Sequence, residues 1–281
     1  MKAKSVFLLG LSAVALASCG VKGYSAKVEY KIFKDQLSKA VENSSLLDVE
    51  KPYSLVMETN SESSMEITHM KDGKNLSEEI TKTKQSGTLK YDSDKSIAHV
   101  ETVYESTEET AESFIEKQYN VEKTYQCDSK YFYDLDNKTK LFEKSQSSKS
   151  KELVYDVARN QIQSFVNSLA NMTFEGDGVS HFIDDNVYTL EIVQNENTDG
   201  ISKNGKTVYQ VTFKDDRIEF ASEGKTEIKQ LNFKEVIVEN SSFSLRKKNV
   251  SLDEEDVGKY LEKSDDDFLS SSPFIAVPFF F

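Results

Sequence analysis

Two segments of the chain repeat their hydrophobic residues with the period of an α-helix. From about residue 26 to 44 the apolar side chains recur three or four residues apart, and from about 150 to 170 they form a longer stripe. This spacing places the apolar side chains on one face of each helix, which must then cover another apolar surface. The first stripe consists of Tyr30, Phe33, Leu37, Ala40 and Val41, and the second is built on Val154, Val157, Ala158, Ile162, Phe165, Val166 and Leu169.

Most of the remaining chain alternates apolar and polar residues with a period of two, which predicts strands with one wet face. Between residues 52 and 145, for example, Leu55 and Met57 alternate with polar neighbours. Turn sequences such as Asp72-Gly73 and Ser86-Gly87 interrupt these runs, so neighbouring strands are expected to pair as antiparallel hairpins. Alternating runs resume after the second helix, near residues 188–192, 209–213, 218–220 and 231–237.

The C-terminal part of the chain combines a helix signal with a very apolar end. Ser251-Leu252-Asp253-Glu254 matches a capping box, which predicts a short helix that contains Val257, Tyr260 and Leu261. The terminus Pro273–Phe281 is apolar throughout but too short to span a membrane. We expect this tail to dock on the body of the protein and complete its core. Alternatively, its aromatic side chains line or plug the mouth of an apolar ligand cavity.

Strands with one apolar face need cover for that face, and two helices cover only part of a sheet this long. A strongly curved sheet wrapped around helices meets both conditions. The sequence therefore predicts an α+β fold: a strongly curved antiparallel sheet, an unclosed half-barrel, packed on two or three helices. We expect a single domain over residues 27–281. A two-part organisation is possible, with parts at 27–148 and 149–245 followed by a C-terminal helix and apolar tail over 246–281.

The order of these elements, together with Tyr131–Asp136 followed by a turn and Leu141-Phe142-Glu143, resembles the LolA/LppX class of envelope lipoproteins. Members of that class form an unclosed antiparallel barrel whose concave side is packed by helices and can hold acyl chains. The resemblance covers about residues 26 to 240 and implies an apolar ligand cavity between sheet and helices. No family binding residue is assigned by position. From the apolar pattern we expect the cavity to be lined by Phe165, Val166, Leu169, Tyr209, Phe213, Phe274 and Phe279.

The N-terminus has the order of features typical of a signal peptide: two lysines, a short apolar run and small residues at a cleavage site. The apolar run Val6–Leu16 is too short for a transmembrane helix, which needs roughly 20 residues. The sequence that follows, Leu16-Ala17-Ser18-Cys19, resembles the lipobox of bacterial lipoproteins.

The lipobox resemblance implies cleavage between Ser18 and Cys19, which removes residues 1–18 as a signal peptide. It also implies that Cys19 carries lipid, palmitate included, and that residues 19–26 form a short tether. Two or three acyl chains on one residue give a stable hold on a bilayer. We therefore expect a protein that is lipid-anchored to the cell membrane and faces outside the cytoplasm.

Charge and cysteine content narrow the possible partners. The formal net charge is −13, and loss of the signal peptide's lysines makes the mature chain more negative still. This charge argues against nucleic acid, whose binding proteins present basic faces, and against a flat association with an anionic leaflet. Besides Cys19 the chain contains only Cys127, so an intramolecular disulfide framework is impossible. We expect Cys127 to be a buried small hydrophobe on a strand.

The segment Gly200–Thr207 matches the phosphate-binding loop pattern at every fixed position. Phosphate binding requires that the glycine-rich turn open a helix, because amides at the helix N-terminus hold the phosphates. Here the following residues, Val208–Phe213, alternate as a strand. We therefore interpret Asn204-Gly205 as a hairpin turn and expect no nucleotide.

Other chemical patterns are incomplete. Asn195–Gly200 resembles the start of a calcium-binding loop, but the position that should supply a bidentate carboxylate is Lys206. The histidines, His69, His99 and His181, are far apart and lack metal-ligand spacing. No established catalytic motif is present, so we expect a protein that is not an enzyme and has no cofactor or metal.

Two functions remain in competition. The first is a membrane-tethered carrier or chaperone for a hydrophobic ligand such as lipid, which requires a roomy apolar cavity. The second is a non-enzymatic surface interaction or structural lipoprotein with a filled core, whose protein partner the sequence does not identify. A substrate-binding protein of a transporter is disfavoured because repeated βαβ units are missing.

Overall fold

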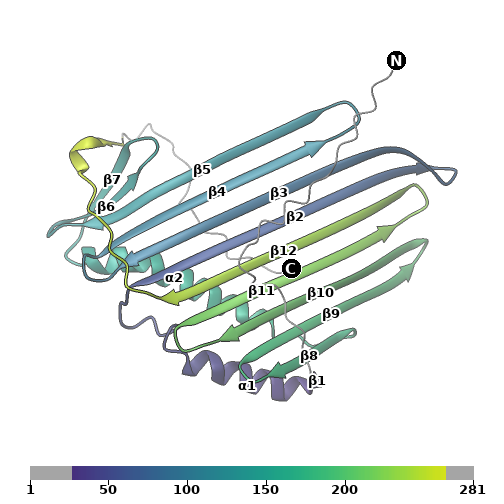
Figure 1. Cartoon of the computed structure of the whole chain (residues 1–281), viewed down its shortest axis with the longest axis horizontal. Coiled ribbons are helices and arrows are strands. Elements are labelled where there is room, and N and C mark those ends of the chain that lie inside the picture. Colours follow the sequence, from purple (N-terminus) through teal and green to yellow (C-terminus); the bar gives the residue numbers. More distant parts are fainter. Residues whose placement is uncertain (1–26, 264–281) are drawn as a thin grey trace.

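The computed structural model describes residues 27–263, which form one continuous antiparallel sheet with two α-helices on one face (Figure 1). Helix α1 spans Tyr30–Asn43 and helix α2 spans Ser150–Asn171. The strands are β1 (Lys27–Val28), β2 (Leu55–Lys71), β3 (Lys74–Asp92), β4 (Ile97–Glu109), β5 (Phe114–Cys127), β6 (Tyr131–Asp136), β7 (Leu141–Gln146), β8 (Val179–Asp184), β9 (Val187–Thr198), β10 (Ile201–Phe213), β11 (Arg217–Lys229), β12 (Phe233–Lys247) and β13 (Leu261–Glu262).

The sheet is built from two runs of consecutive hairpins that meet in the middle. The described strands follow the order β1-β8-β9-β10-β11-β12-β2-β3-β4-β5-β6-β7-β13. Strands β2 to β7 form one run and β8 to β12 the other, and the antiparallel pair β12–β2 joins them. At one edge β13 pairs in parallel with β7. Segments 27–148 and 149–245 therefore share a single sheet.

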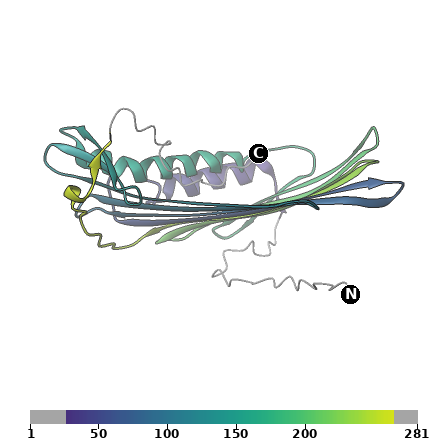
Figure 2. The same ribbon diagram turned by 90° about the horizontal axis from the view of Figure 1, so that it is seen from above.

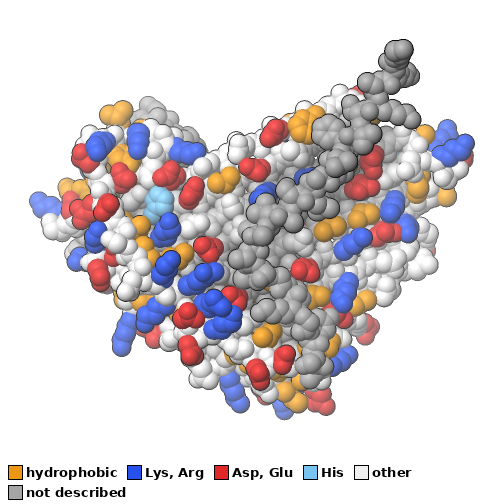
Figure 3. Space-filling model, viewed as in Figure 1, with side chains coloured by type: hydrophobic (Ala, Val, Ile, Leu, Met, Phe, Trp, Pro, Cys, Tyr) orange, Lys and Arg blue, Asp and Glu red, His pale blue; other side chains and the backbone are white. Residues whose placement is uncertain are grey.

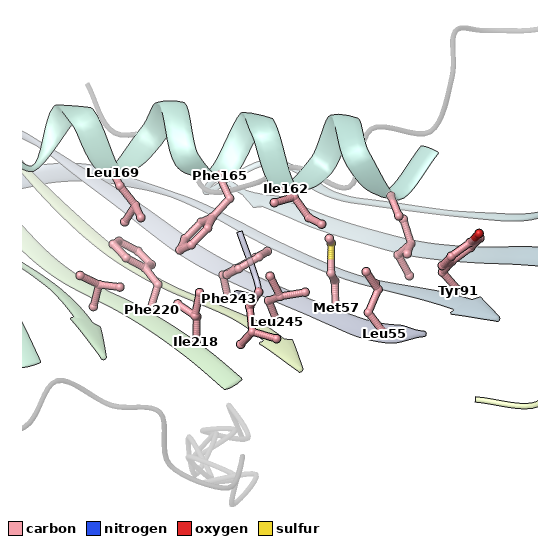
Figure 4. Packing of buried hydrophobic residues seen from close by; sticks show 14 of the residues in the cluster. Leu55, Met57, Tyr91, Ile162, Phe165, Leu169, Ile218, Phe220, Phe243 and Leu245 are labelled. Atoms are coloured by element: carbon pink, nitrogen blue, oxygen red, sulfur yellow. The ribbon is translucent and has the colours of Figure 1, made fainter. Parts of the chain in front are cut away.

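The core lies between the helices and the strand ends beneath them. Cross-strand partners point to the same face of a sheet, so Met57 of β2 and its partner Leu89 of β3 both face the helices. Phe165 on α2 stacks on Phe243 of β12 with ring centroids 4.1 Å apart (Figure 4). Phe220 of β11 meets the Phe165 ring edge-on, with ring centroids 6.4 Å apart. The helix stripes predicted from the sequence supply one wall of this core.

The long strands continue well beyond the helices. Strands β2 and β3 contain 17 and 19 residues, and a strand rises about 3.3 Å per residue. Helix α2 crosses the strands at one end, and the opposite ends bend toward the helix side with no described helix over them (Figure 2). We call this part the distal sheet. It comprises residues 60–71 of β2, 74–86 of β3, 103–109 of β4, 114–120 of β5, 193–198 of β9, 201–207 of β10, 223–229 of β11 and 233–241 of β12.

Contacts between neighbouring strands stabilise the distal sheet in place of a second layer. The carboxylate of Glu62 lies 3.3 Å from the ammonium of Lys84, and the hydroxyls of Ser63 and Thr83 are 2.6 Å apart. The rings of Tyr104 and Tyr119 stack with centroids 4.9 Å apart. Each such cross-strand pair contributes roughly 0.2–1 kcal/mol, so a series of them supports a layer that is wet on both faces.

The predicted fold class was wrong in its balance of helix and sheet. The sheet is open and curved, as expected, but it has 13 strands and the described chain has only two α-helices, which cover one end of one face. The protein is therefore mostly sheet, and the predicted α+β packing on two or three helices does not apply. Many residues of the distal sheet are polar, such as Ser63 and Thr83, and alternation within one segment did not predict strands of this length. The cross-strand contacts that stabilise them lie between strands and leave no signal within one segment.

Two local predictions also require correction. The expected C-terminal helix is a single 3₁₀ turn, Val257–Lys259, where a carboxylate oxygen of Asp256 accepts a hydrogen bond from the Gly258 amide. Ser86-Gly87 lies inside β3, where Gly87 pairs with Thr59 and Thr102, and not at a turn. In both places a short local motif was outweighed by pairing or packing with distant residues.

Candidate functional site

The predicted cavity residues lie around the packed core. Phe165 and Leu169 are buried, while Val166, Tyr209 and Phe213 are partly buried and packed against the same cluster. The stack of Phe165 on Phe243 fills the space between α2 and the sheet at that point. The other predicted lining residues, Phe274 and Phe279, and the predicted cleavage and lipidation residues, Ser18 and Cys19, lie outside the described residues.

The segment that matches a phosphate-binding loop forms part of a hairpin. Asp199 and Gly200 make the turn, with φ angles of 51° and 80°, and β10 then runs without interruption from Ile201 to Phe213. The predicted turn at Asn204-Gly205 was therefore wrong, because these residues lie inside the strand. The observed register places Val211 opposite Tyr188 on the core side. Burial of Val211 and the other apolar residues on its side of β10 selects the register, because a shift by one residue would turn them toward solvent.

Two of the hollows on the described surface are lined mostly by polar residues. One has a volume of about 270 Å³ and lies on β2, β3 and β12. There the Arg246 guanidinium lies 3.6 Å from the Glu58 carboxylate, which also accepts a hydrogen bond of 3.3 Å from Ser244. The other has a volume of about 660 Å³ and lies beside the C-terminal end of α1, where Phe213 is part of its lining.

Burial shifts the pKa of two groups that the sequence singled out, Cys127 and His181. Burial raises the pKa of the Cys127 thiol, which disfavours the reactive thiolate. Burial lowers the pKa of His181, whose Nε2 lies 3.0 Å from the Phe174 carbonyl oxygen. Within residues 27–263 no three His, Cys, Asp or Glu side chains are arranged to hold a metal ion. In the same range, neither helix has the length and apolar character needed to cross a membrane.

A group of apolar side chains lies on the helix side of the distal sheet, beyond the end of the core. Met65 of β2 is the direct partner of Ile237 of β12, and both continue the alternation that points Met57 and Leu245 toward the helices. All five members of the group are partly exposed. We call this group the distal apolar cluster. It consists of Met65, Ile67, Ile228, Phe233 and Ile237.

Figure 3 shows the opposite face of the sheet, where basic, acidic and hydrophobic side chains are interspersed over the strands. The alternation of Met65 and Ile67 was visible in the sequence and predicted a strand. It did not reveal that neighbouring strands would add Ile228 and Ile237 on the same side, because register between distant strands is a property of the folded sheet.

Comparison with known proteins identifies no family. No protein-family model matches the chain, and no curated protein sequence matches it. A solved structure titled for lipid–protein interactions in lipovitellin is 7% identical with a TM-score of 0.27, covering 73% of this chain and 26% of that chain. The chain thus spans about a quarter of that protein. The translocator domain of the autotransporter NalP from Neisseria meningitidis is 7% identical with a TM-score of 0.18, covering 76% and 94%. Likenesses this low carry no argument about function.

Proposed function

We propose that the chain is a lipid-anchored protein of the cell envelope that binds a hydrophobic ligand, such as lipid, on the helix side of its distal sheet. The observation that supports this proposal is the distal apolar cluster. Its five side chains come from three adjacent strands, with Glu235 between Ile67 and Ile228, and stay partly exposed on a face that no described helix covers. Clustered apolar side chains on a surface are a common mark of binding sites because their exposure to water costs free energy.

The proposed ligand lies on the sheet and not inside the core. The rings of Phe165 and Phe243 stack directly on each other, so the apolar face of α2 is already covered by the sheet at that point. Between this packed core and the distal apolar cluster, the helix-side positions carry the small side chains of Ser61, Ser241 and Ser222 together with the exposed carboxylate of Glu239. An acyl chain lying across this band would contact apolar groups at both ends, each buried methylene contributing roughly 0.8 kcal/mol.

A pair of matched double variants tests the ligand site. Met65→Ser with Ile237→Ser removes two directly paired side chains from the distal apolar cluster. Val236→Ser with Val238→Ser changes two partly exposed residues of β12 that point to the opposite face of the sheet. We expect the first variant to bind a fluorescent fatty acid about ten-fold more weakly, a loss of about 1.4 kcal/mol. The second should bind it as the parent does, and equal losses in both variants would refute the site.

Two measurements test the remaining parts of the proposal. Mass spectrometry of lipids extracted with the membrane-purified protein should identify a retained hydrophobic molecule. Mass measurement of the native N-terminus should show a lipid-modified Cys19, and the Cys19→Ala variant should move from the membrane to the soluble fraction. An unmodified thiol at Cys19 would contradict the anchor, whatever the outcome for the ligand site.

The second candidate function is a non-enzymatic interaction or structural lipoprotein. The filled core around Phe165 favours it, because such a protein needs no cavity. The polar hollow at Glu58 and Arg246 then provides a surface where a protein partner can form hydrogen bonds. A lipid extract that is empty, together with unchanged probe binding by the Met65→Ser, Ile237→Ser variant, would select this function over the first.

A further inference from the structure

Four long hairpins of the sheet have their turns at its distal end, and each carries an exposed apolar side chain there. The hairpins are β2–β3, β4–β5, β9–β10 and β11–β12, whose turns lie on the right side of Figure 1. We call these four side chains the tip row. They are Leu76 at 65% exposed, Phe114 at 62%, Ile201 at 41% and Leu231 at 89%.

The backbone at these tips is ordered by hydrogen bonds and tight turns, so the apolar side chains are held outward. Asp72 and Gly73 form a two-residue turn with φ angles of 53° and 74°. The Thr110 amide donates to the Ser113 carbonyl immediately before Phe114. The Gln230 amide donates to the Phe233 carbonyl, which places Leu231 inside the turn.

A β-bulge positions Leu76. His69 pairs with Ser77 and Met70 pairs with Asn75, so Leu76 has no cross-strand partner. Bulges re-aim side chains at sheet edges. The Met70 amide also donates to the Asn232 carbonyl at 2.7 Å, which ties this tip to the neighbouring β11–β12 tip.

The two central tips are also rich in lysine. Lys71 and Lys74 flank the β2–β3 turn, and neither forms an ion pair within the described residues. Lys229 and Lys234 flank the β11–β12 turn, where both lie close to the carboxylate of Glu227. Apolar side chains next to lysines are the pattern of segments that sit at a lipid–water interface, where phosphate groups balance the ammonium charge.

We propose that the tip row contacts the surface of a phospholipid bilayer and sets the orientation of the sheet on it. Adjacent hairpins are spaced by two strands, roughly 10 Å, so the apolar side chains form separate protrusions. A protein interface needs a continuous patch, whereas separate protrusions on one sheet can enter the interfacial layer together. The β4–β5 tip carries Glu108, Glu109 and Glu112, and Glu227 offsets the lysines of the β11–β12 tip, so attraction to headgroup phosphate is confined to Lys71 and Lys74, which flank Asp72 at the β2–β3 turn. This inference goes beyond the proposed function and does not require a ligand on the distal apolar cluster.

The absence of tryptophan from the sequence provides a clean test. The lipid-anchored protein is reconstituted in phosphatidylcholine vesicles, with and without phosphatidylglycerol, carrying either Leu231→Trp or Leu261→Trp. Both leucines are highly exposed, but Leu261 is on β13 at the far edge of the sheet. The expected result is blue-shifted emission and quenching by brominated acyl chains for Leu231→Trp only. Emission that stays water-like, with quenching by aqueous iodide equal to that of the control, would overturn the proposal.

A second substitution distinguishes insertion from other contacts. Leu76→Ser in the Leu231→Trp background should lower the ratio of inserted to free tips about ten-fold, because it removes one of the apolar side chains that enter the lipid. Phe174→Ser, an exposed site outside the tip row, should leave the ratio unchanged. A blue shift without vesicles that grows with protein concentration would indicate a second copy as the partner and refute the proposal. Met65→Ser with Ile237→Ser should retain tip insertion, so failure of the ligand site and failure of the tip row are separable.

Discussion

Replacing Phe165 with alanine separates a packed core from a ligand cavity. The side chain is 1% exposed, stacks on Phe243 and meets Phe220 edge-on. If α2 packs directly on the sheet in solution, Phe165→Ala leaves a void next to the rings of Phe243 and Phe220. Substitutions of this kind cost about 3–5 kcal/mol, a substantial part of the 5–15 kcal/mol that stabilises a typical native protein.

The measurement is urea unfolding followed by far-ultraviolet circular dichroism. For a chain of this size the slope is about 3 kcal/mol per molar urea, so a loss of about 4 kcal/mol lowers the midpoint by about 1.3 M. Val166→Ala is the matched control, since Val166 is the next residue on α2 and only partly buried. It should cost less than about 1.5 kcal/mol. Both variants should bind the fatty-acid probe as the parent does.

The opposite pattern would refute the packed core. A Phe165→Ala protein that loses less than about 1 kcal/mol of stability and takes up less probe would place Phe165 on the wall of a cavity. The helix–sheet space would then be the ligand site that the sequence pattern suggested, and the distal apolar cluster would lose its role.

Three further outcomes follow from the geometry. Although burial would raise the pKa of Asp92, hydrogen bonds from the amides of Leu252, Lys95 and Asp94 hold it below its usual value. The lowered pKa stabilises the folded protein above the unfolded pKa, which is near 4, and this stability is lost as pH falls through the folded pKa. Asp92→Asn should therefore cost about 2 kcal/mol of stability at neutral pH. The cost should shrink when urea unfolding is repeated at progressively lower pH. Gly178→Ala should lower the melting temperature far more than Gly73→Ala, because both have positive φ but only the first new Cβ meets a backbone carbonyl. In hydrogen exchange, the amides of β2 at its core end, near Leu55 and Met57, should outlast those of its distal part, and uniform protection along the strand would contradict a single-layer distal sheet.

The sequence predicted the helices well because each carries its own signal. The apolar stripes placed helices at about 26–44 and 150–170, and the structure has them at Tyr30–Asn43 and Ser150–Asn171. Strand alternation and antiparallel pairing were also confirmed, as was an open, curved sheet. These features depend on periodicity within a segment, which a single sequence contains.

Strand length, turn position and the candidate sites depended on information that a segment does not contain. Asp199-Gly200 and Asn204-Gly205 are both suitable hairpin turns, and only the pairing of Val211 with Tyr188 and Phe220 decides between them. The distal apolar cluster and the tip row likewise arise from strands far apart in the sequence. The lipid anchor at Cys19 remains a prediction, since it lies outside the described residues.

The central pair β12–β2 has a consequence for how the chain folds. Strand β2 ends at residue 71, yet the partner for one of its two sides does not begin until Phe233. That side stays unpaired until most of the chain has been synthesised, and closing so long a loop slows folding. The hairpins β2–β7 and β8–β12 pair locally, so the β12–β2 contact is the step that joins the two halves of the sheet last.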